Sequence, residues 1–363
     1  MVGSVPGMMP HGVLARIGAD AASQRTALDV LTRQVASGRR AQGFADLGAQ
    51  TAAVLGLDAD RAVNEAWQAN VSAATGRMRA GLAAIDRIME IAARLNADLA
   101  RLNGLDGPSV DVIAADARAA LREVAGLLNT QYAGAYVFAG QDSANPPVPD
   151  ADAILSSGFY TQIAAAVGGL AGAGAAATAA ATLGIAASNA PGTSPFSAFL
   201  SRPAAALQAE RAQVETGMRR YEATGLLASA NSAVPSQGTS TTGAYMRDVL
   251  RALATVGAMD SSQLAIADYP ALVRDTRESL RGAIAAMGAD AGVFGDGVAR
   301  LEAIRARAGE RADAARAGAA AVTDVDMAAA LSRLSQLQTQ LQASYQMIAQ
   351  VSGLSLARFL SGG

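Results

Sequence analysis

Residues 67–102 read "WQANVSAATGRMRAGLAAIDRIMEIAARLNADLARL", and this stretch decides the fold. Apolar or small residues recur in it at alternating spacings of four and three, which is the a/d pattern of a coiled-coil helix. Charged residues fill the positions between them. We therefore expect a long helix with one apolar seam. The seam positions are Trp67, Val71, Ala74, Met78, Gly81, Ile85, Ile88, Ala92, Leu95, Leu99 and Leu102.

A second helix is expected directly after this one, because "NGLDGP" (103–108) combines a glycine stop with a proline. We place its start near Ser109, with Ser109 or Asp111 as the cap, and its end at about Ala133. Its seam would contain Ile113, Ala117, Ala120, Val124 and Leu127. The short connection predicts that the two helices are antiparallel neighbours.

Helical periodicity returns in the last third of the chain, from Tyr245 onward. The glycines of "GADAGVFGDG" (288–297) are expected to break it, with a long helix resuming at about Val298. In "TDVD" (323–326) a Thr precedes an acid by three residues, which resembles a capping box and predicts that the last helix is capped or continuous at Thr323.

The middle of the chain has a different composition. No charged residue occurs from Ala153 to Ser201, and the large aliphatic side chains are too few to favour a membrane span, so we expect an Ala-rich helix or a loose connection there. Residues 203–245 combine possible short strands with a Ser/Thr/Gly loop, which predicts a compact β-containing part.

The composition excludes several classes of function. The 363 residues contain no cysteine and a single histidine, His11, so disulfides, thiolate catalysis and a histidine-dependent triad are ruled out. The formal net charge of -2 gives no field that would attract nucleic acid. We therefore expect neither an enzyme nor a nucleic-acid-binding protein, with no catalytic residue, cofactor or metal. The N-terminal residues lack the pattern of a cleaved signal peptide.

The last helix carries a wide apolar stripe. Met327, Leu334, Leu341 and Ile348 recur every seven residues, and further apolar residues flank this column on both sides. The stripe is too wide for a single partner helix, so we expect it to be an assembly surface. Its members are Met327, Leu331, Leu334, Leu337, Leu341, Tyr345, Ile348, Val351, Leu354, Leu356 and Phe359.

Three stretches carry a resemblance to a known family. Residues 31–57 read "LTRQVASGRRAQGFADLGAQTAAVLGL", residues 132–148 read "YAGAYVFAGQDSANPPV", and residues 334–360 read "LSQLQTQLQASYQMIAQVSGLSLARFL". Together, at the two ends of the chain, they resemble the bacterial flagellin family and most closely its hook-associated branch. The matching positions are Gln34, Ser37, Gly38, Arg39, Arg40, Tyr136, Phe138 and Gly140. In the family, a loop with two aspartates usually follows a basic pair, here Arg39 and Arg40. This sequence keeps only Asp46 in that loop.

The resemblance implies a mainly α protein, an elongated bundle or coiled coil of N- and C-terminal helices with a small α+β or irregular distal insert. It implies terminal assembly arms at 1–45 and 325–363, a helical rod at 46–142 and 246–324, and a variable insert at 143–245. The N-terminal arm would pair with the C-terminal stripe through Leu28, Leu31 and Val35.

The resemblance also implies partners and a location. The partners would be further copies of the chain, another hook-associated protein, flagellin and an export chaperone, with no nucleic acid and no membrane span. The location would be the extracellular bacterial flagellum, reached through type III export without a cleaved signal peptide. Three functions stay open at this point: a hook–filament junction protein, the filament subunit, and an unrelated coiled-coil scaffold.

Overall fold

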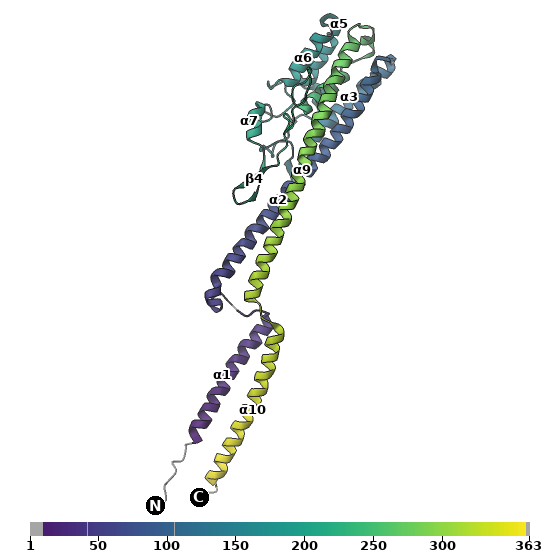
Figure 1. The fold of residues 1–363 in the computed structure, drawn as a ribbon. Coiled ribbons are helices and arrows are strands. Elements are labelled where there is room, and N and C mark those ends of the chain that lie inside the picture. Colours follow the sequence, from purple (N-terminus) through teal and green to yellow (C-terminus); the bar gives the residue numbers. More distant parts are fainter. Residues whose placement is uncertain (1–9, 42, 105, 361–363) are drawn as a thin grey trace, which may run out of the picture. The chain divides into compact units, whose positions relative to one another are not determined.

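The computed structural model describes residues 10–41, 43–104 and 106–360, with the side chains of 10–14, 103 and 351–360 left out (Figure 1). As the sequence predicts, the chain is mainly helical. It divides into two compact units, which are described separately. Unit 1 combines the chain up to Asn64 with the chain from Glu310 onward, and unit 2 is Glu65–Gly309. Two long helices, α2 (Thr51–Arg101) and α9 (Tyr269–Thr323), contribute residues to both units.

Unit 2 is built on the α2 seam predicted from residues 67–102. From Val71 to Leu102 every seam position is buried except the half-buried Ala74. The α9 helix lies against α2, where Glu302 pairs with Arg79 and Gly297 lies beside Met78. The seam has a glycine at position 81, where Leu226 packs directly against the backbone. A Cβ at position 81 would lie 2.2 Å from Leu226 Cδ1.

Replacement of Gly81 by alanine is therefore expected to destabilise unit 2. We expect Gly81→Ala to lower the free energy of unfolding by about 1–3 kcal/mol, the usual cost of overpacking a core. Gly126→Ala is the matched control, because this exposed helical glycine has open space where a Cβ would lie and alanine favours helix. Urea unfolding followed by circular dichroism compares the two. A stabilised Gly81→Ala protein would contradict the packing.

The second helix, α3 (Gly107–Leu128), begins and ends earlier than predicted. Its N-cap is Asp106, whose carboxylate accepts a hydrogen bond from Ser109 N at 3.2 Å, so the expected cap at Ser109 or Asp111 was wrong. Hydrogen bonding to the Ser109 side chain and to its backbone N–H lowers the pKa of Asp106. The helix stops before the hairpin of β1 (Gln131–Tyr132) and β2 (Ala135–Tyr136), whose turn needs positive φ at Ala133 and Gly134.

The expected break at 288–297 is also wrong, because α9 continues through it. Asp290, in the middle of this segment, is fully buried and accepts hydrogen bonds from the backbone N–H groups of Ser232, Ala233 and Val234 and from Tyr245 Oη, at 2.7–3.2 Å. These tertiary contacts outweigh the weak helix propensity of the local glycines.

The chain between the rod helices forms a compact part of unit 2. The uncharged stretch folds into η3 (Ile154–Ser156), α4 (Gly158–Gly168), α5 (Leu170–Ala173) and α6 (Ala175–Ala187). It is followed by α7 (Ala204–Ala209) and by the predicted strands, β3 (Gln213–Gly217) and β4 (Arg220–Ala223), which pair as an antiparallel hairpin. Over the described residues, none of the helices has the length and apolar character needed to cross a membrane.

A fully buried helix, α8 (Tyr245–Gly257), lies at the centre of this part, against α3, α4 and α6. It carries charged side chains into the core. Arg251 donates to Asp275 at 2.8 Å and to Thr182 Oγ1 at 3.1 Å, while Asp248 accepts from Thr242 N at 2.8 Å. Burial lowers the pKa of Arg251 and raises the pKa of Asp248, because the protein interior disfavours the charged form of each side chain. The hydrogen bonds of the network offset this cost of desolvation. A short helix, η4 (Ser261–Ala265), then leads into α9.

Candidate assembly surface

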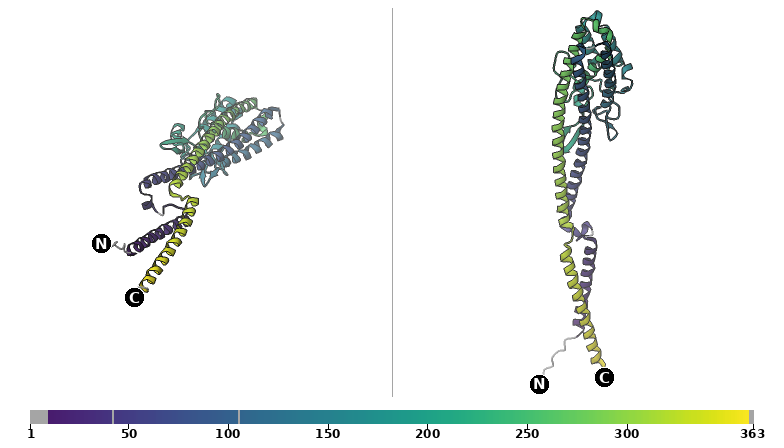
Figure 2. Two further views of the ribbon diagram at one scale, coloured as in Figure 1. Left: turned by 60° about the horizontal axis from the view of Figure 1, so that its bottom comes forward. Right: turned by 90° about the vertical axis from the view of Figure 1, so that its right-hand side faces the viewer.

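The first and last helices of the chain pair along each other in unit 1. In both views of Figure 2, α1 (Pro10–Ser37) and α10 (Met327–Leu360) lie side by side, and their contacts follow one face of each helix. The inward positions repeat at spacings of four and three, as in a coiled coil. On α1 they are Ile17, Ala21, Gln24, Leu28, Leu31 and Val35, and on α10 they are Ala330, Leu334, Leu337, Leu341, Ser344 and Ile348.

The seam between these two helices is thin and incompletely covered. Among its twelve positions only Ala21, Ala330 and Leu341 are buried, and the others are half-buried. Polar side chains interrupt it, since Ser344 Oγ lies 3.5 Å from Gln24 Oε1. Two helices with so little buried apolar surface gain little stability from each other, because most helical stability in proteins comes from tertiary packing.

Large apolar side chains of α10 lie exposed beside this seam. Met327, Leu331 and Tyr345 occupy one flank, and Met347 the other, with 41–53% of each residue exposed. Arg25 of α1 lies over the Tyr345 ring at 6.0 Å from its centroid, the outer limit of a cation–π contact. Leu331 follows Met327 by one helical turn, and Tyr345 lies further along the same flank of α10. We take these exposed side chains as a candidate surface for another protein. We call Met327, Leu331 and Tyr345 the open flank.

The structure thus places the predicted stripe in two groups. Leu28, Leu31 and Val35 lie in the seam with Leu334, Leu337, Leu341 and Ile348, whereas the open flank lies exposed beside this seam. Val351, Leu354, Leu356 and Phe359 lie outside the described side chains. The small and polar seam members Ala21, Gln24, Ala330 and Ser344 were not predicted, because only their heptad spacing marks them in the sequence.

Ser37, Gly38 and Arg39 form the turn at the end of α1. Gly38 has φ 69° and its carbonyl accepts Val325 N at 3.0 Å, while Arg40 N donates to Thr323 O at 2.7 Å. Arg39 forms an isolated β-bridge with Asp324. Gln34 Nε2 donates to Arg40 O at 2.9 Å and closes the turn. These residues therefore join the end of α1 to the connection between α9 and α10.

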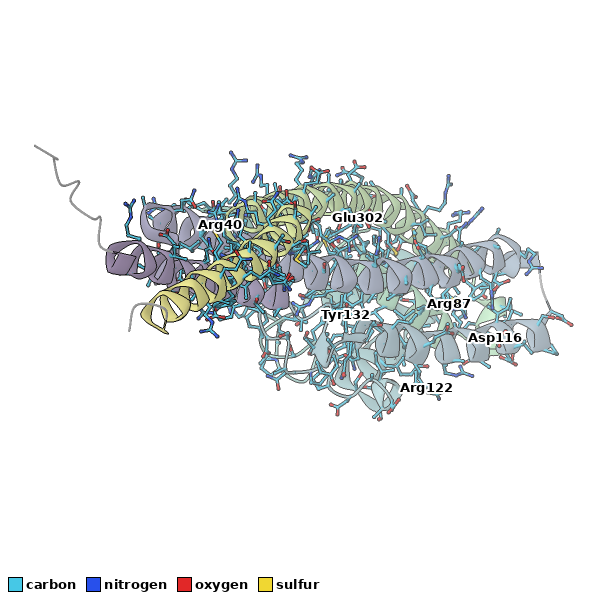
Figure 3. All side chains as sticks on the ribbon, turned by 90° about the horizontal axis from the view of Figure 1, so that it is seen from below. Arg40, Arg87, Asp116, Arg122, Tyr132 and Glu302 are labelled. Carbon is cyan, nitrogen blue, oxygen red and sulfur yellow. The ribbon has the colours of Figure 1, made fainter. Side chains whose placement is uncertain are left out.

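This connection also corrects the expected cap at Thr323. Thr323 is the last residue of α9, and its hydroxyl donates back to Ala319 O at 3.0 Å. Asp326 begins α10 instead, because its carboxylate accepts Ala329 N at 3.0 Å. The loop after the basic pair contains η1 (Phe44–Gln50), where Asp46 accepts Gly43 N at 3.1 Å. Arg40, labelled in Figure 3, donates to Gln50 at 2.7 Å.

Tyr136, Phe138 and Gly140 lie in unit 2, where Phe138 and Gly140 are buried and Tyr136 is half-buried. Phe138 is 1% exposed, and its carbonyl accepts Ala228 N at 2.9 Å. Gly140 has φ 63° and donates to Leu226 O at 3.3 Å. Tyr136 N donates to Ser143 O at 2.8 Å. The segment therefore ties the β1–β2 hairpin to residues 226–228, the same segment that packs onto Gly81.

These features define a class of protein: a helical structural protein whose two chain ends pair and leave an apolar surface for association. Two family models match the chain. The bacterial flagellin N-terminal helical region matches residues 18–143, and the bacterial flagellin C-terminal helical region matches residues 278–360. Together they cover more than half of the 363 residues, and the chain belongs to the flagellin-like family. No curated protein matched the chain.

Family membership fixes the general function. The chain is a structural, non-enzymatic axial protein of the bacterial flagellum, and its family self-assembles in flagellar structures and forms the extracellular filament. The N-terminal match includes α1 from Gly18 onward, and the C-terminal match includes the whole of α10. Nearly all of the assembly surface described above therefore lies within the matched regions.

Proposed function

We propose that this chain is a hook-associated protein that joins the flagellar hook to the filament, corresponding to hook-associated protein 3. The observation that carries the proposal is the segment "YVFAG" (136–140), which resembles the hook-associated branch and is unusual in filament subunits. Its Phe138 is buried and its Gly140 has a positive φ, so both residue types are required where they stand. The tail at 334–360 resembles the same branch.

In this proposal the terminal arms, 1–45 and 325–363, are the assembly elements, and 46–142 with 246–324 form the rod that supports the insert at 143–245. The α1–α10 pair buries too little surface to be rigid in the monomer. On assembly, neighbouring copies cover the open flank of Met327, Leu331 and Tyr345. Full burial of a large apolar side chain contributes about 1.5–3 kcal/mol, and these half-exposed side chains would gain part of that when a neighbour covers them.

The partners we propose are further copies of the chain in a ring or layer, another hook-associated protein on the hook side, flagellin on the filament side, and an export chaperone before assembly. The chaperone would cover the same apolar stripe of α10, because an exposed stripe of this kind associates non-specifically. Export would proceed through the flagellar type III apparatus without a cleaved signal peptide.

Gene deletion separates the junction protein from the filament subunit. We expect the deletion strain to build hooks and to release intact flagellin monomer into the medium, because the subunit is made but finds no attachment. Complementation with the wild-type gene is expected to restore attached filaments. Loss of the flagellin itself from the medium would identify the chain as the filament subunit and would overturn the junction proposal.

A further inference from the structure

The hairpin of β3 and β4 ends in an exposed apolar tip. Met218 is 82% exposed and Tyr221 is 60% exposed, the two highest values among the large apolar residues in the described part of unit 2. Arg219 and Arg220 lie between them, and Arg219 adopts φ 58°, which is uncommon for a residue other than glycine. The tip, residues 218–221, therefore presents two long apolar side chains with two positive charges. Met and Tyr side chains are common anchors in protein interfaces.

A groove of about 250 Å³ lies between α2 and α3 elsewhere in the same unit. Its floor is apolar, formed by the buried Ile91, Leu95 and Ala117 with Leu253 of α8 behind them. The volume is below the ~300–1,000 Å³ typical of small-molecule pockets. It suits one or two inserted side chains better than a free ligand.

The rim of the groove is mainly acidic. Asp98, Asp116 and Glu123 line it, together with the cation Arg94. Asp98 pairs with Arg101 at 2.6 Å and Glu123 pairs with Arg87 at 2.8 Å. The carboxylate of Asp116 has no hydrogen bond or ion pair with any residue that the structure describes. Figure 3 shows it on α3, next to the α2 helix that carries Arg87. The groove therefore offers an apolar floor and one acid, Asp116, whose carboxylate has no partner among the described residues, and these suit the apolar side chains and the arginines of the tip.

Figure 1 draws β4 to the left of α9 and α3 to its right, so the tip and the groove of one chain are separated in that view. We therefore assign the tip to a second copy of the chain. A contact between two different surfaces of identical chains is heterologous, so repetition forms a ring or an open row of subunits.

We propose that the β3–β4 tip of one copy inserts Met218 and Tyr221 into the α2–α3 groove of a neighbouring copy, with Arg219 or Arg220 facing Asp116. This contact lies in unit 2 and is separate from the α1–α10 arms. It requires only the self-assembly of the family, so it holds for a junction protein and for a filament subunit alike.

Disulfide trapping tests the contact directly, because the natural chain contains no cysteine. Full-length Met218→Cys protein is mixed with isotope-labelled Ala119→Cys protein, in which the exposed rim residue Ala119 carries the thiol. After mild oxidation, mass spectrometry counts disulfides between the two variants. Met218→Cys mixed with Val293→Cys is the matched control, since Val293 is 46% exposed on α9 and lies outside the groove.

We expect the disulfide between positions 218 and 119 to form at least about fivefold faster than the disulfide between positions 218 and 293. We also expect a single chain that carries both Met218→Cys and Ala119→Cys to form a ladder of multimers. Equal rates for Ala119 and Val293 would overturn the proposal. All three sites are exposed, so the variants are expected to fold, which circular dichroism checks. The rates are independent of the deletion phenotype, so failure here leaves the junction proposal standing.

Charge reversal gives a second readout. Asp116→Arg in the Ala119→Cys chain is expected to lower the trapping rate about threefold, in the range of an exposed ion pair. Arg219→Asp with Arg220→Asp in the Met218→Cys chain is expected to restore it when the two are mixed. A further decrease on mixing the two reversed chains would contradict the assigned pairing.

Discussion

Leu341→Asp is expected to abolish incorporation of the chain into the flagellum while leaving unit 2 folded. Leu341 is the buried centre of the α10 seam, at 7% exposed, and it faces α1. The substitution removes an apolar contact worth about 1.5–3 kcal/mol and places a charge between the helices, so the pair is weakened by about 3 kcal/mol or more. Electron microscopy of cells that produce only this variant should find hooks without filaments.

Thr339→Asp is the matched control for this substitution, because Thr339 is exposed on the same helix and differs little from Asp in helix propensity. It is expected to support normal attached filaments. Both variants should appear in the medium after export in similar amounts. Normal filaments on Leu341→Asp cells would contradict the role of the α1–α10 seam in assembly.

Asp290→Ala is expected to be the most destabilising single substitution in unit 2. It leaves the N–H groups of Ser232, Ala233 and Val234, together with Tyr245 Oη, without their acceptor. Hydrogen bonds to a buried carboxylate contribute about 1.5–3 kcal/mol each, and solvent replaces some of them at the partly exposed loop, so we expect a loss of about 3–5 kcal/mol. Urea unfolding followed by circular dichroism measures it.

The control for Asp290→Ala lies on the same helix six residues later. Asp296 is exposed, and Asp296→Ala is expected to change the free energy of unfolding by less than about 0.5 kcal/mol. Equal small effects at both positions would show that the loop at 232–234 holds its place without Asp290.

The rod was predictable because its pattern is local and long. The α2 seam repeats over about five heptads, and the structure buries it almost completely. The break at 288–297 was predicted wrongly for the opposite reason. Asp290 acts on residues more than fifty positions earlier in the chain, and Gly297 fits beside Met78 of a helix far away in sequence. Such long-range contacts override glycine signals that a local pattern reads as a stop.

The terminal arms were predictable in their large residues and not in their small ones. Leu334, Leu337, Leu341 and Ile348 stand out as apolar positions in a heptad. Ala21 and Ser344 occupy positions in the same seam, but a small side chain can be assigned to an interface only when its helical register is known. The capping residues Asp106 and Asp326 were missed because several acids and hydroxyls in each connection fit the cap pattern equally well.

Growth on filament seeds tests the junction proposal most directly. Purified full-length chain is mixed with short seeds cut from flagellar filaments, and the seeds are measured by electron microscopy against seeds supplied with flagellin. We predict that the flagellin-fed seeds lengthen continuously, whereas the chain adds no more than a short layer, because a junction protein would join two different neighbours instead of extending on itself. Long filaments grown from the chain alone would contradict the proposal and identify it as a filament subunit.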